Sequence, residues 1–353
     1  MRRSPRSSRP SAARCKAELH TRQPQTRRDQ EYIMKYAIIG VGNMGKNHAR
    51  AAHELGTTEL VAVADASEQT AANIAKLYQC QAYNDYIKML DECDIDAVSI
   101  CVPTTLHTPV AMECLRRGKH VLLEKPIAPT VEEGLQLQAY AREQGVQLMI
   151  GHIERFNPAV VKVKELLRNN EIGRVVSIMA RRVGIFPPQI RDANIAVDLA
   201  IHDLDIVNYL LDEFPTDITS DKRRNHIELR EDSVEFFLRY PSASAYVQAN
   251  WITPVKIRKL NITGTDGYLE MDYINQRIQF YKSNYEKYRD EPGHISGYSD
   301  YVLKYMEPDL VEIQVAKREP LKEQISYFTR AIRNGDEIDN SFAIQALRIA
   351  LQS

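Results

Sequence analysis

The first half of the chain alternates short apolar runs with amphipathic segments. The runs have the length of strands that are buried on both faces, and the segments between them repeat with a helical period. The expected strands are 36–39, 60–64, 97–102, 121–123 and 147–150, and the expected helices are 47–55, 67–78, 108–117 and 131–144. This alternation predicts an α/β domain with a doubly wound parallel sheet over residues 34–154.

From about residue 155 the pattern changes to longer stretches in which apolar and polar residues alternate. Such alternation is typical of antiparallel strands with one face on a core. The expected strands are 175–183, 234–240, 243–251, 258–263, 268–273 and 277–281, and the expected helices are 158–169, 197–210, 321–333 and 341–351. Residues 155–353 are therefore predicted to form a second α/β domain that contains an antiparallel sheet.

Residues 1–33 differ in composition from the rest. They hold nine Lys/Arg, three Asp/Glu and three Pro, and no apolar period is visible. We expect this extension to be disordered. An Arg- and Ser-rich start is also typical of a transit peptide, and a basic tail can bind nucleic acid. Because Met34 directly precedes the first strand, we prefer the interpretation that it is the true start.

The overall composition is that of an ordinary globular protein, with 44% hydrophobic and 26% charged residues and a net charge of -1. No apolar run approaches the roughly 20 residues of a membrane span, so we expect no membrane association. The mildly acidic body gives no reason to expect nucleic-acid binding. The five cysteines form no metal-binding pattern, so we expect reduced thiols, a cytoplasmic protein and no metal site.

A glycine-rich turn of the form GxGxxG joins the first strand to the first helix. A strand before it, a helix after it and an acid about twenty residues later are the context of a dinucleotide site. The acid is Asp65, which would accept from ribose hydroxyls and repel a 2'-phosphate, so we expect NAD rather than NADP. Asp65 could instead cap the following helix. The expected contacts in the turn are Gly40, Gly42, Asn43, Met44 and Gly45.

Polar residues follow two of the predicted parallel strands, where ligands of such sheets bind. Glu124 and Lys125, followed by Pro126, end the strand 121–123, and we expect Lys125 to take part in chemistry. The pair could also be a surface ion pair. The loop after 97–102 supplies Pro103, Thr104 and His107 as a wall of the cofactor site, although it could be only a polar turn.

One helix in the second half, 197–210, carries three polar residues on one face: Asp198, His202 and Asp205 lie at i, i+4 and i+7. A histidine between two carboxylates is a good general base. Two alternatives remain, a polar seam against the other domain and a metal site, although no third strong ligand lies at a useful spacing.

These motifs together resemble the glucose-fructose oxidoreductase / inositol dehydrogenase / rhizopine-catabolism (Gfo/Idh/MocA) family. The resemblance extends from Met34 nearly to the end of the chain. It implies a Rossmann domain followed by an α/β domain with a large open antiparallel sheet, which is often the interface of a dimer or tetramer. It also implies oxidation or reduction of sugars or polyols with a nicotinamide cofactor.

The stretches 151–158 and 186–192 are similar to the branch that oxidises the 3-hydroxyl of UDP-N-acetylglucosamine. The resemblance implies a 3-keto product that feeds an aminotransferase in amino-sugar and lipid A biosynthesis. Two alternatives stay open, a dehydrogenase of a free polyol such as inositol and a non-catalytic NAD-binding sensor.

The resemblance also assigns roles to individual residues. Lys125 would hold the reacting hydroxyl, and Glu124 would position Lys125 and the cofactor. His202 would take the hydroxyl proton, and Asp198 would orient the site or relay the proton. The substrate contacts would be Arg155, Asn157 and Arg191. The two arginines suit a diphosphate, although either could be a structural salt-bridge residue.

Overall fold

A computed structural model describes residues 32–186, 194–227, 229–283 and 309–352. The extension predicted for residues 1–33 lies outside this part of the chain except for its last two residues. Arg191 also lies outside the described residues.

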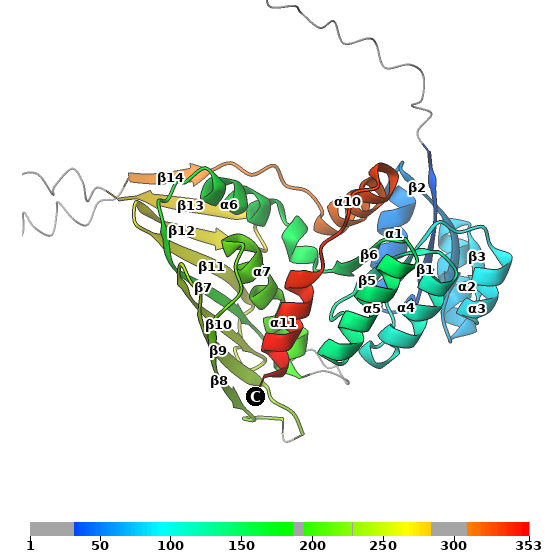
Figure 1. The fold of residues 1–353 in the computed structure, drawn as a ribbon, viewed down its shortest axis with the longest axis horizontal. Helices are drawn as coiled ribbons and strands as arrows, with labels where there is room; N and C mark the ends of the chain where they lie inside the picture. The colour runs from blue at the N-terminus through cyan, green and yellow to red at the C-terminus, as the bar shows by residue number, and fades with distance from the viewer. Residues whose placement is uncertain (1–31, 187–193, 228, 284–308, 353) are drawn as a thin grey trace, which may run out of the picture. The chain divides into compact units, whose positions relative to one another are not determined.

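The N-terminal sheet has six parallel strands in the order β3-β2-β1-β4-β5-β6, which confirms the predicted doubly wound architecture (Figure 1). Its central strands β4 and β5 are buried on both faces, as their apolar runs require. The strands are β1 (Met34–Ile39), β2 (Thr58–Ala64), β3 (Gln81–Tyr83), β4 (Ala97–Ile100), β5 (His120–Glu124) and β6 (Leu148–Gly151). The helices are α1 (Gly45–Glu54), α2 (Glu68–Tyr78), α3 (Tyr86–Glu92), α4 (His107–Arg116) and α5 (Val131–Glu143), with a 3₁₀ turn η1 (Thr104–Leu106) before α4.

The second sheet has eight strands in the order β14-β13-β12-β11-β7-β10-β9-β8. Its neighbouring strands are antiparallel except for β7 and β10, which run parallel, so the prediction of an antiparallel sheet holds with one exception. The strands are β7 (Val175–Val183), β8 (Asp217–Arg223), β9 (Ser233–Arg239), β10 (Ser244–Asn250), β11 (Ile257–Gly264), β12 (Gly267–Asp272), β13 (Arg277–Lys282) and β14 (Asp309–Ile313).

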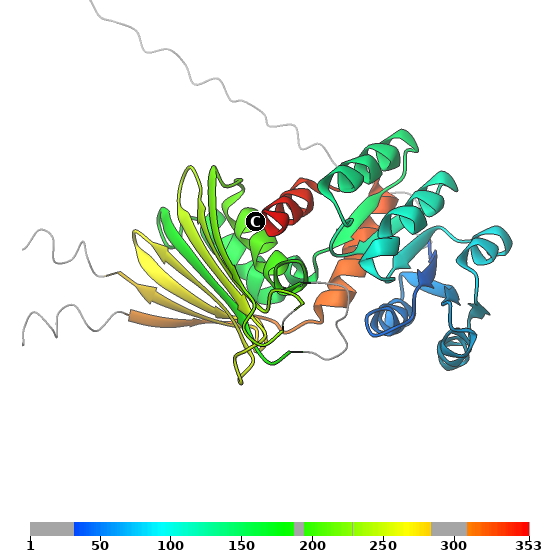
Figure 2. The same cartoon turned by 90° about the horizontal axis from the view of Figure 1, so that it is seen from below.

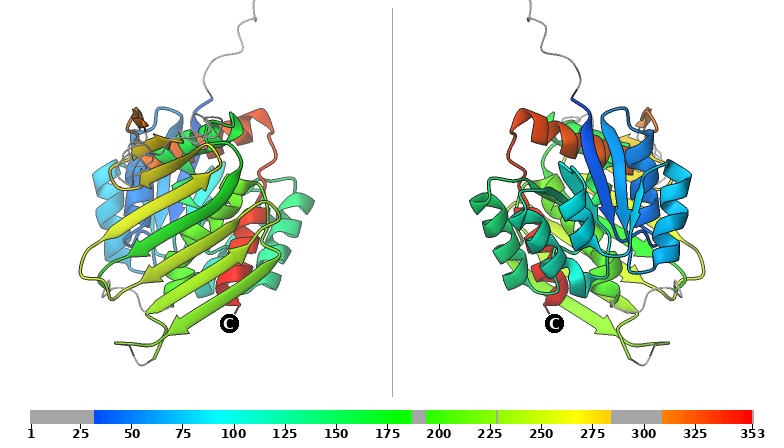
Figure 3. Two further views of the ribbon diagram at one scale, coloured as in Figure 1. Left: turned by 90° about the vertical axis from the view of Figure 1, so that its left-hand side faces the viewer. Right: turned by 90° about the vertical axis from the view of Figure 1, so that its right-hand side faces the viewer.

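Helices cover one face of this sheet, and Figure 3 shows its other face without a helix over it. Helix α11 packs on α7 and also contacts α5 of the first domain (Figures 1 and 2). The remaining elements are η2 (Ile153–Phe156), α6 (Pro158–Arg168), a π-helical turn η3 (Ala196–Ala200), α7 (Ile201–Leu211), α10 (Pro320–Asn334) and α11 (Ser341–Leu351). None of the helices in the described part of the chain is long and apolar enough to cross a bilayer.

Candidate active site

The backbone of the glycine-rich turn between β1 and α1 requires glycine at two of its three glycine positions, Gly40 and Gly45. Gly40 has a φ of +82°, and a Cβ there would lie 2.8 Å from the carbonyl oxygen of Cys101. A Cβ on Gly45 would lie 1.8 Å from the carbonyl oxygen of Gly40, so only glycine lets the helix start so close to the strand. A Cβ on Gly42 would meet nothing within 4 Å. The turn is therefore closed toward the protein and open at Gly42, and no side chain caps α1. This geometry fits a pyrophosphate at the helix N-terminus.

Asp65 stands beside this turn and holds it in shape. Its carboxylate accepts from the backbone N–H of Val41 and from that of Ser67, both at 2.9 Å. Ser67, not Asp65, is the N-cap of α2. Each carboxylate oxygen keeps a second lone pair, and Asp65 lines a cavity of about 460 Å³ together with Gly42 and Pro103. This cavity suits the adenosine half of a dinucleotide, and the negative charge disfavours a 2'-phosphate.

The other predicted cofactor contacts divide into two groups. Asn43 and Met44 are exposed in the turn, and Thr104 begins η1 next to Pro103. His107 is buried, and its two ring nitrogens lie 2.7 Å and 3.0 Å from the carbonyl oxygens of Pro126 and Val102. It therefore ties the ends of β4 and β5 together, which shapes the wall of the site from behind.

Lys125 and Asp198 meet between the two domains. Lys125 directly follows β5, and its Nζ donates to the backbone oxygen of Asp198 at 2.8 Å and to its Oδ1 at 3.2 Å. Both side chains are mostly buried, with exposed fractions of 16% and 18%. The structure thus brings together two of the three predicted catalytic residues, which are far apart in the sequence.

The three polar residues predicted to share one α-helical face have separate partners. Asp198 lies in the π-helical turn η3 and contacts Lys125, whereas His202 and Asp205 lie on α7. Asp205 binds Arg155, with 2.7 Å between its Oδ2 and Nε, and lies 3.6 Å from Nδ1 of His152. His202 does not lie between two carboxylates that hydrogen-bond to it.

His202 is nevertheless suited to accept a proton, for a different physical reason. Burial, followed by the positive charges of Lys125 and Arg182, lowers its pKa well below 6.5. Its Nδ1 is buried and makes no hydrogen bond to the described residues. A buried nitrogen without a partner is costly unless a ligand satisfies it. His202 is therefore neutral near neutral pH, and its Nε2, which makes no hydrogen bond to the described residues and is not buried, is the ring nitrogen open to a ligand.

A buried chain of hydrogen bonds behind Lys125 was not predicted. The hydroxyls of Tyr36 and Ser99 lie 2.7 Å apart, and Ser99 Oγ lies 3.0 Å from Nδ1 of His48. On the other side, Nε2 of His48 lies 3.0 Å from Oε1 of Glu124. The second oxygen of Glu124 accepts from the backbone N–H of Lys125 at 3.2 Å. The chain thus connects the helix of the glycine-rich turn to the end of β5.

The charge of Glu124 depends on this chain. Burial alone would raise the pKa of Glu124, but the hydrogen bond from His48 and the charges of His48, Lys125 and His107 lower it overall. Because a carboxylate only accepts, Nε2 of His48 carries the donated proton. The sequence held one signal for this role, since His48 shares the buried face of α1 with Gly45, Ala49 and Ala52.

A second unpredicted cluster fixes α7 on the large sheet. Arg182 on β7 is buried, and its guanidinium contacts Asp203 through Nε at 2.6 Å and Nη2 at 3.0 Å. Its Nη1 donates to Glu154 of η2 at 2.8 Å. One side chain therefore holds together a strand of the sheet, the helix that carries His202 and the entry to the second domain.

Arg155 and Asn157, both predicted to contact substrate, have protein partners. Besides its ion pair with Asp205, Arg155 lies over the rings of Tyr209 and Phe342 at 5.7 Å and 5.5 Å. Asn157 is 3% exposed, caps α6 by accepting from Ala159 N–H at 3.1 Å, and donates to the backbone oxygen of Tyr273 at 3.0 Å. The amide of Asn157 thus serves the helix rather than a ligand.

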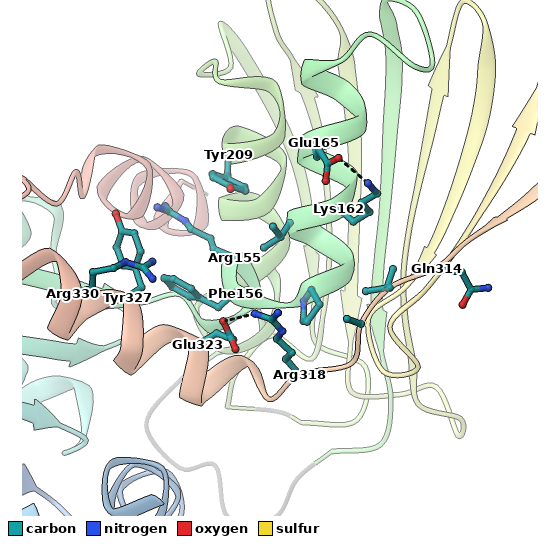
Figure 4. Close-up of a pocket in the computed structure, with 14 residues that line it drawn as sticks. Arg155, Phe156, Lys162, Glu165, Tyr209, Gln314, Arg318, Glu323, Tyr327 and Arg330 are labelled. Carbon is teal, nitrogen blue, oxygen red and sulfur yellow. Dashed lines mark hydrogen bonds and ion pairs between the residues drawn. The ribbon is translucent and has the colours of Figure 1, made fainter. Parts of the chain in front are cut away.

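Figure 4 shows where the Arg155 side chain extends. It lines a pocket of about 590 Å³ with residues of α6 and α10, among them Tyr327 and Arg330. Among the described residues that line this pocket, Lys125, Asp198 and His202 are absent. The contacts of Arg155 therefore favour the salt-bridge alternative, and its substrate role stays a prediction.

The described residues contain no group of three or more His, Cys, Asp or Glu side chains arranged to hold a metal ion.

Comparison with known proteins assigns both domains to one family. Residues 34–152 match the model described as "Oxidoreductase family, NAD-binding Rossmann fold", and residues 160–270 match the "GFO/IDH/MocA C-terminal domain". The chain is 29% identical over 299 residues to a UDP-N-acetylglucosamine 3-dehydrogenase of Acidithiobacillus ferrooxidans, covering 85% of this chain and 88% of that protein.

Two further comparisons show how far the similarity extends. A solved structure of the Acidithiobacillus UDP-N-acetylglucosamine 3-dehydrogenase superposes with a TM-score of 0.77 at 27% identity, over 90% of this chain and 96% of that one. An inositol 2-dehydrogenase of Rhizobium meliloti is 34% identical over 192 residues, which span 53% of this chain and 58% of that protein. The matched domains and the geometry of the glycine-rich turn together show that the chain belongs to the Gfo/Idh/MocA family of oxidoreductases and binds NAD in its Rossmann domain.

Proposed function

We propose that the protein oxidises the 3-hydroxyl of a UDP-sugar, UDP-N-acetylglucosamine, to the 3-keto form. The observation that carries this proposal is the contact of Lys125 with Asp198. Lys125 also lies close enough to His202 for its charge to lower the pKa of the histidine. These residues lie at the carboxyl end of the Rossmann sheet, where the reacting part of a bound ligand is expected. When bound, NAD supplies the hydride acceptor for the reaction.

The side chains divide the remaining work among them. An ammonium group has three donors, and Lys125 uses two directions on Asp198, which leaves one for the substrate hydroxyl. A lysine charge beside that hydroxyl lowers the cost of its deprotonation. His202 takes the proton, since its lowered pKa keeps the ring neutral beforehand. Asp198 fixes the direction of the lysine.

The choice of a nucleotide sugar rests on similarity. The relative from Acidithiobacillus ferrooxidans named above carries that activity in its name, and the match spans 88% of its length. A 3-keto sugar is a substrate for transamination, so we propose that an aminotransferase consumes the product, in amino-sugar and lipid A biosynthesis.

Two other functions have some support. Dehydrogenation of a free polyol is favoured by the 34% identity to an inositol 2-dehydrogenase, which covers only about half of this chain. An NAD-binding sensor without catalysis is a third reading. The contact between Lys125 and Asp198 counts against it, because a sensor has no need of a proton-transfer site.

The first experiment is reduction of NAD by the purified full-length chain. UDP-N-acetylglucosamine, free N-acetylglucosamine and myo-inositol are compared, each with and without 2-oxoglutarate or an aminotransferase that draws the equilibrium forward. We expect turnover only with the UDP-sugar. Turnover with inositol or the free sugar alone would refute the nucleotide-sugar assignment, and NAD binding without any turnover would favour the sensor.

We also propose that the second domain, residues 155–353, carries both substrate binding and self-association. Figure 3 shows one face of its sheet that no helix of the described residues covers. Large apolar side chains on the strands are exposed, among them Met179 and Phe237. A dimer or tetramer would bury them. Light scattering of the protein as it elutes from a size-exclusion column measures the mass of the assembly. A monomer at micromolar concentration would contradict the proposal.

A further inference from the structure

Two arginines lie side by side on adjacent strands of the large sheet. Arg258 on β11 is the register partner of Arg182 on β7. The positions two and four residues further along β11, Leu260 and Ile262, are fully buried. Because side chains alternate between the faces of a strand, Arg258 points to the same face, on which the helices pack.

The two arginines differ in how their charges are balanced. Arg182 binds Asp203 and Glu154. Arg258 is half-buried, and in the described part of the chain no carboxylate lies within ion-pair distance of it. Its Nη1 donates to the backbone oxygens of Val183 and Ile257, at 2.6 Å and 2.9 Å. Like charges at opposed positions destabilise a sheet. Burial and the charge of Arg182 lower the pKa of Arg258, and Asp203, Glu154 and Asp198 offset this only at a distance, so a guanidinium without a direct carboxylate partner needs a reason.

The free edge of the Arg258 guanidinium is open to a ligand. Its Nε and Nη2 make no hydrogen bond to the described residues. They are also not buried, so a ligand can reach them. The same charge acts on the active site, because Arg258 is one of the cations that lower the pKa of His202, after burial, Lys125, Arg182 and His152. Arg258 therefore belongs to the same electrostatic environment as the catalytic residues.

We propose that the Nε–Nη2 edge of Arg258 binds a phosphate of the substrate's diphosphate, an inference that rests on the proposed function. A guanidinium edge presents two parallel N–H groups that match two phosphate oxygens. The two carbonyl contacts at Nη1 hold the group in place before the ligand arrives. A guanidinium without a direct carboxylate partner can pair with an anionic substrate, whereas a neutral polyol offers it no charge to pair with. Arg155 is less suited to the role, since Asp205 already neutralises it.

The test compares full-length Arg258→Met with Lys259→Met, a matched control that removes a charge from the exposed side of the same strand. Calorimetry in the presence of NAD measures the Kd of UDP and of inorganic pyrophosphate. For each ligand, we expect the Kd of Lys259→Met to equal that of the wild type. The Kd of Arg258→Met should be at least about tenfold higher. The Kd of NAD should stay unchanged in all three. Equal affinity for UDP in Arg258→Met would overturn the inference.

Further outcomes separate this inference from the proposed function. If wild type oxidises UDP-N-acetylglucosamine and Arg258→Met keeps its KM, only the inference fails. If wild type oxidises a free sugar and binds neither UDP nor pyrophosphate, both fail. If Arg258→Met no longer binds NAD, it has lost its fold, and Arg258→Lys decides instead. Lysine keeps the charge but not the two-pronged contact, so a weaker affinity for pyrophosphate is expected and an unchanged one would overturn the inference.

Discussion

The hydrogen bond from His48 to Glu124 can be tested by removing the histidine. The substitution His48→Leu keeps a side chain of similar bulk in the buried site but deletes the donor at Nε2. Glu124 would then be a buried carboxylate with one remaining hydrogen-bond donor among the described residues, the backbone N–H of Lys125. We expect a loss of stability together with a lower kcat, because Glu124 accepts from the backbone N–H of Lys125 and so helps to position that residue.

The magnitude follows from the kind of contact that is lost. Leaving a buried group without its hydrogen-bond partner costs about 1–3 kcal/mol, and more when the group is charged. Because Glu124 keeps the Lys125 N–H and the nearby lysine charge, we expect about 3 kcal/mol. A domain of 150–250 residues loses about 2–4 °C in Tm for each kcal/mol. A decrease of roughly 6–12 °C is therefore expected for His48→Leu.

A second substitution separates loss of the hydrogen bond from loss of packing. The double variant His48→Leu with Glu124→Gln places a neutral amide where the unpaired charge would be. Because an amide is cheaper to bury than a carboxylate, its Tm should lie above that of His48→Leu alone. Thermal unfolding of the four proteins of this cycle, with NAD binding as a check of the fold, gives the coupling directly.

The stability that the charged form of Glu124 contributes depends on pH. The pKa of Glu124 is lowered in the folded protein, so its contribution is present above the unfolded value of about 4.3 and is lost as the pH falls through the folded value. The Tm difference between wild type and His48→Leu should be largest near neutral pH and should shrink below about pH 4. A difference that is constant with pH, or a Tm equal to that of wild type at pH 7, would refute the reasoning.

Three other predictions concern the cofactor turn and the catalytic residues. Gly42→Ala should fold normally, since its Cβ meets nothing within 4 Å, but should bind NAD at least about tenfold more weakly because the methyl group stands where the pyrophosphate approaches. Gly45→Ala should fail to fold or lose NAD binding altogether, and comparable Tm and Kd in the two variants would contradict this. Lys125→Ala should lower kcat by about a hundredfold or more while the Kd of NAD stays within twofold, measured by fluorescence titration. The acid limb of kcat/KM should lie below pH 6.5, because the pKa of His202 is lowered and its neutral form persists to lower pH. A limb above that value that disappears in His202→Asn would show that the histidine titrates normally.

The parallel sheet could be predicted because its evidence is local. Each central strand is a short, mostly apolar run, and each crossover helix has its own period, so no distant contact is needed to recognise them. The strands β3, β8 and β14 escaped prediction because they are edge or near-edge strands with polar faces and lack an apolar run. The glycine-rich turn was equally accessible, since Gly40 and Gly45 are required by backbone geometry alone.

The partners of the charged residues could not be predicted, because tertiary contacts choose them. The spacing of Asp198, His202 and Asp205 was interpreted as two acids flanking a histidine, but Asp198, in the π-helical turn, pairs with Lys125, and Asp205 pairs with Arg155. Arg182 was recoverable in part, because counting by twos from Ile178 along β7 places it on the buried face. Nothing local to that strand indicates that Asp203 and Glu154 would meet it there.

The charges around α7 bear on which substrate the site takes. Its acids are each bound to a different cation: Asp198 to Lys125, Asp203 to Arg182 and Asp205 to Arg155. His202, between them in sequence, is neutral. Arg182 is also bound by Glu154, whereas Arg258 has no carboxylate in direct contact among the described residues; Asp203, Glu154 and Asp198 act on its charge only at a distance. A site for a neutral polyol gains nothing from that charge and bears its desolvation cost. A substrate that brings its own negative charge removes this cost on binding, which favours a nucleotide sugar over inositol.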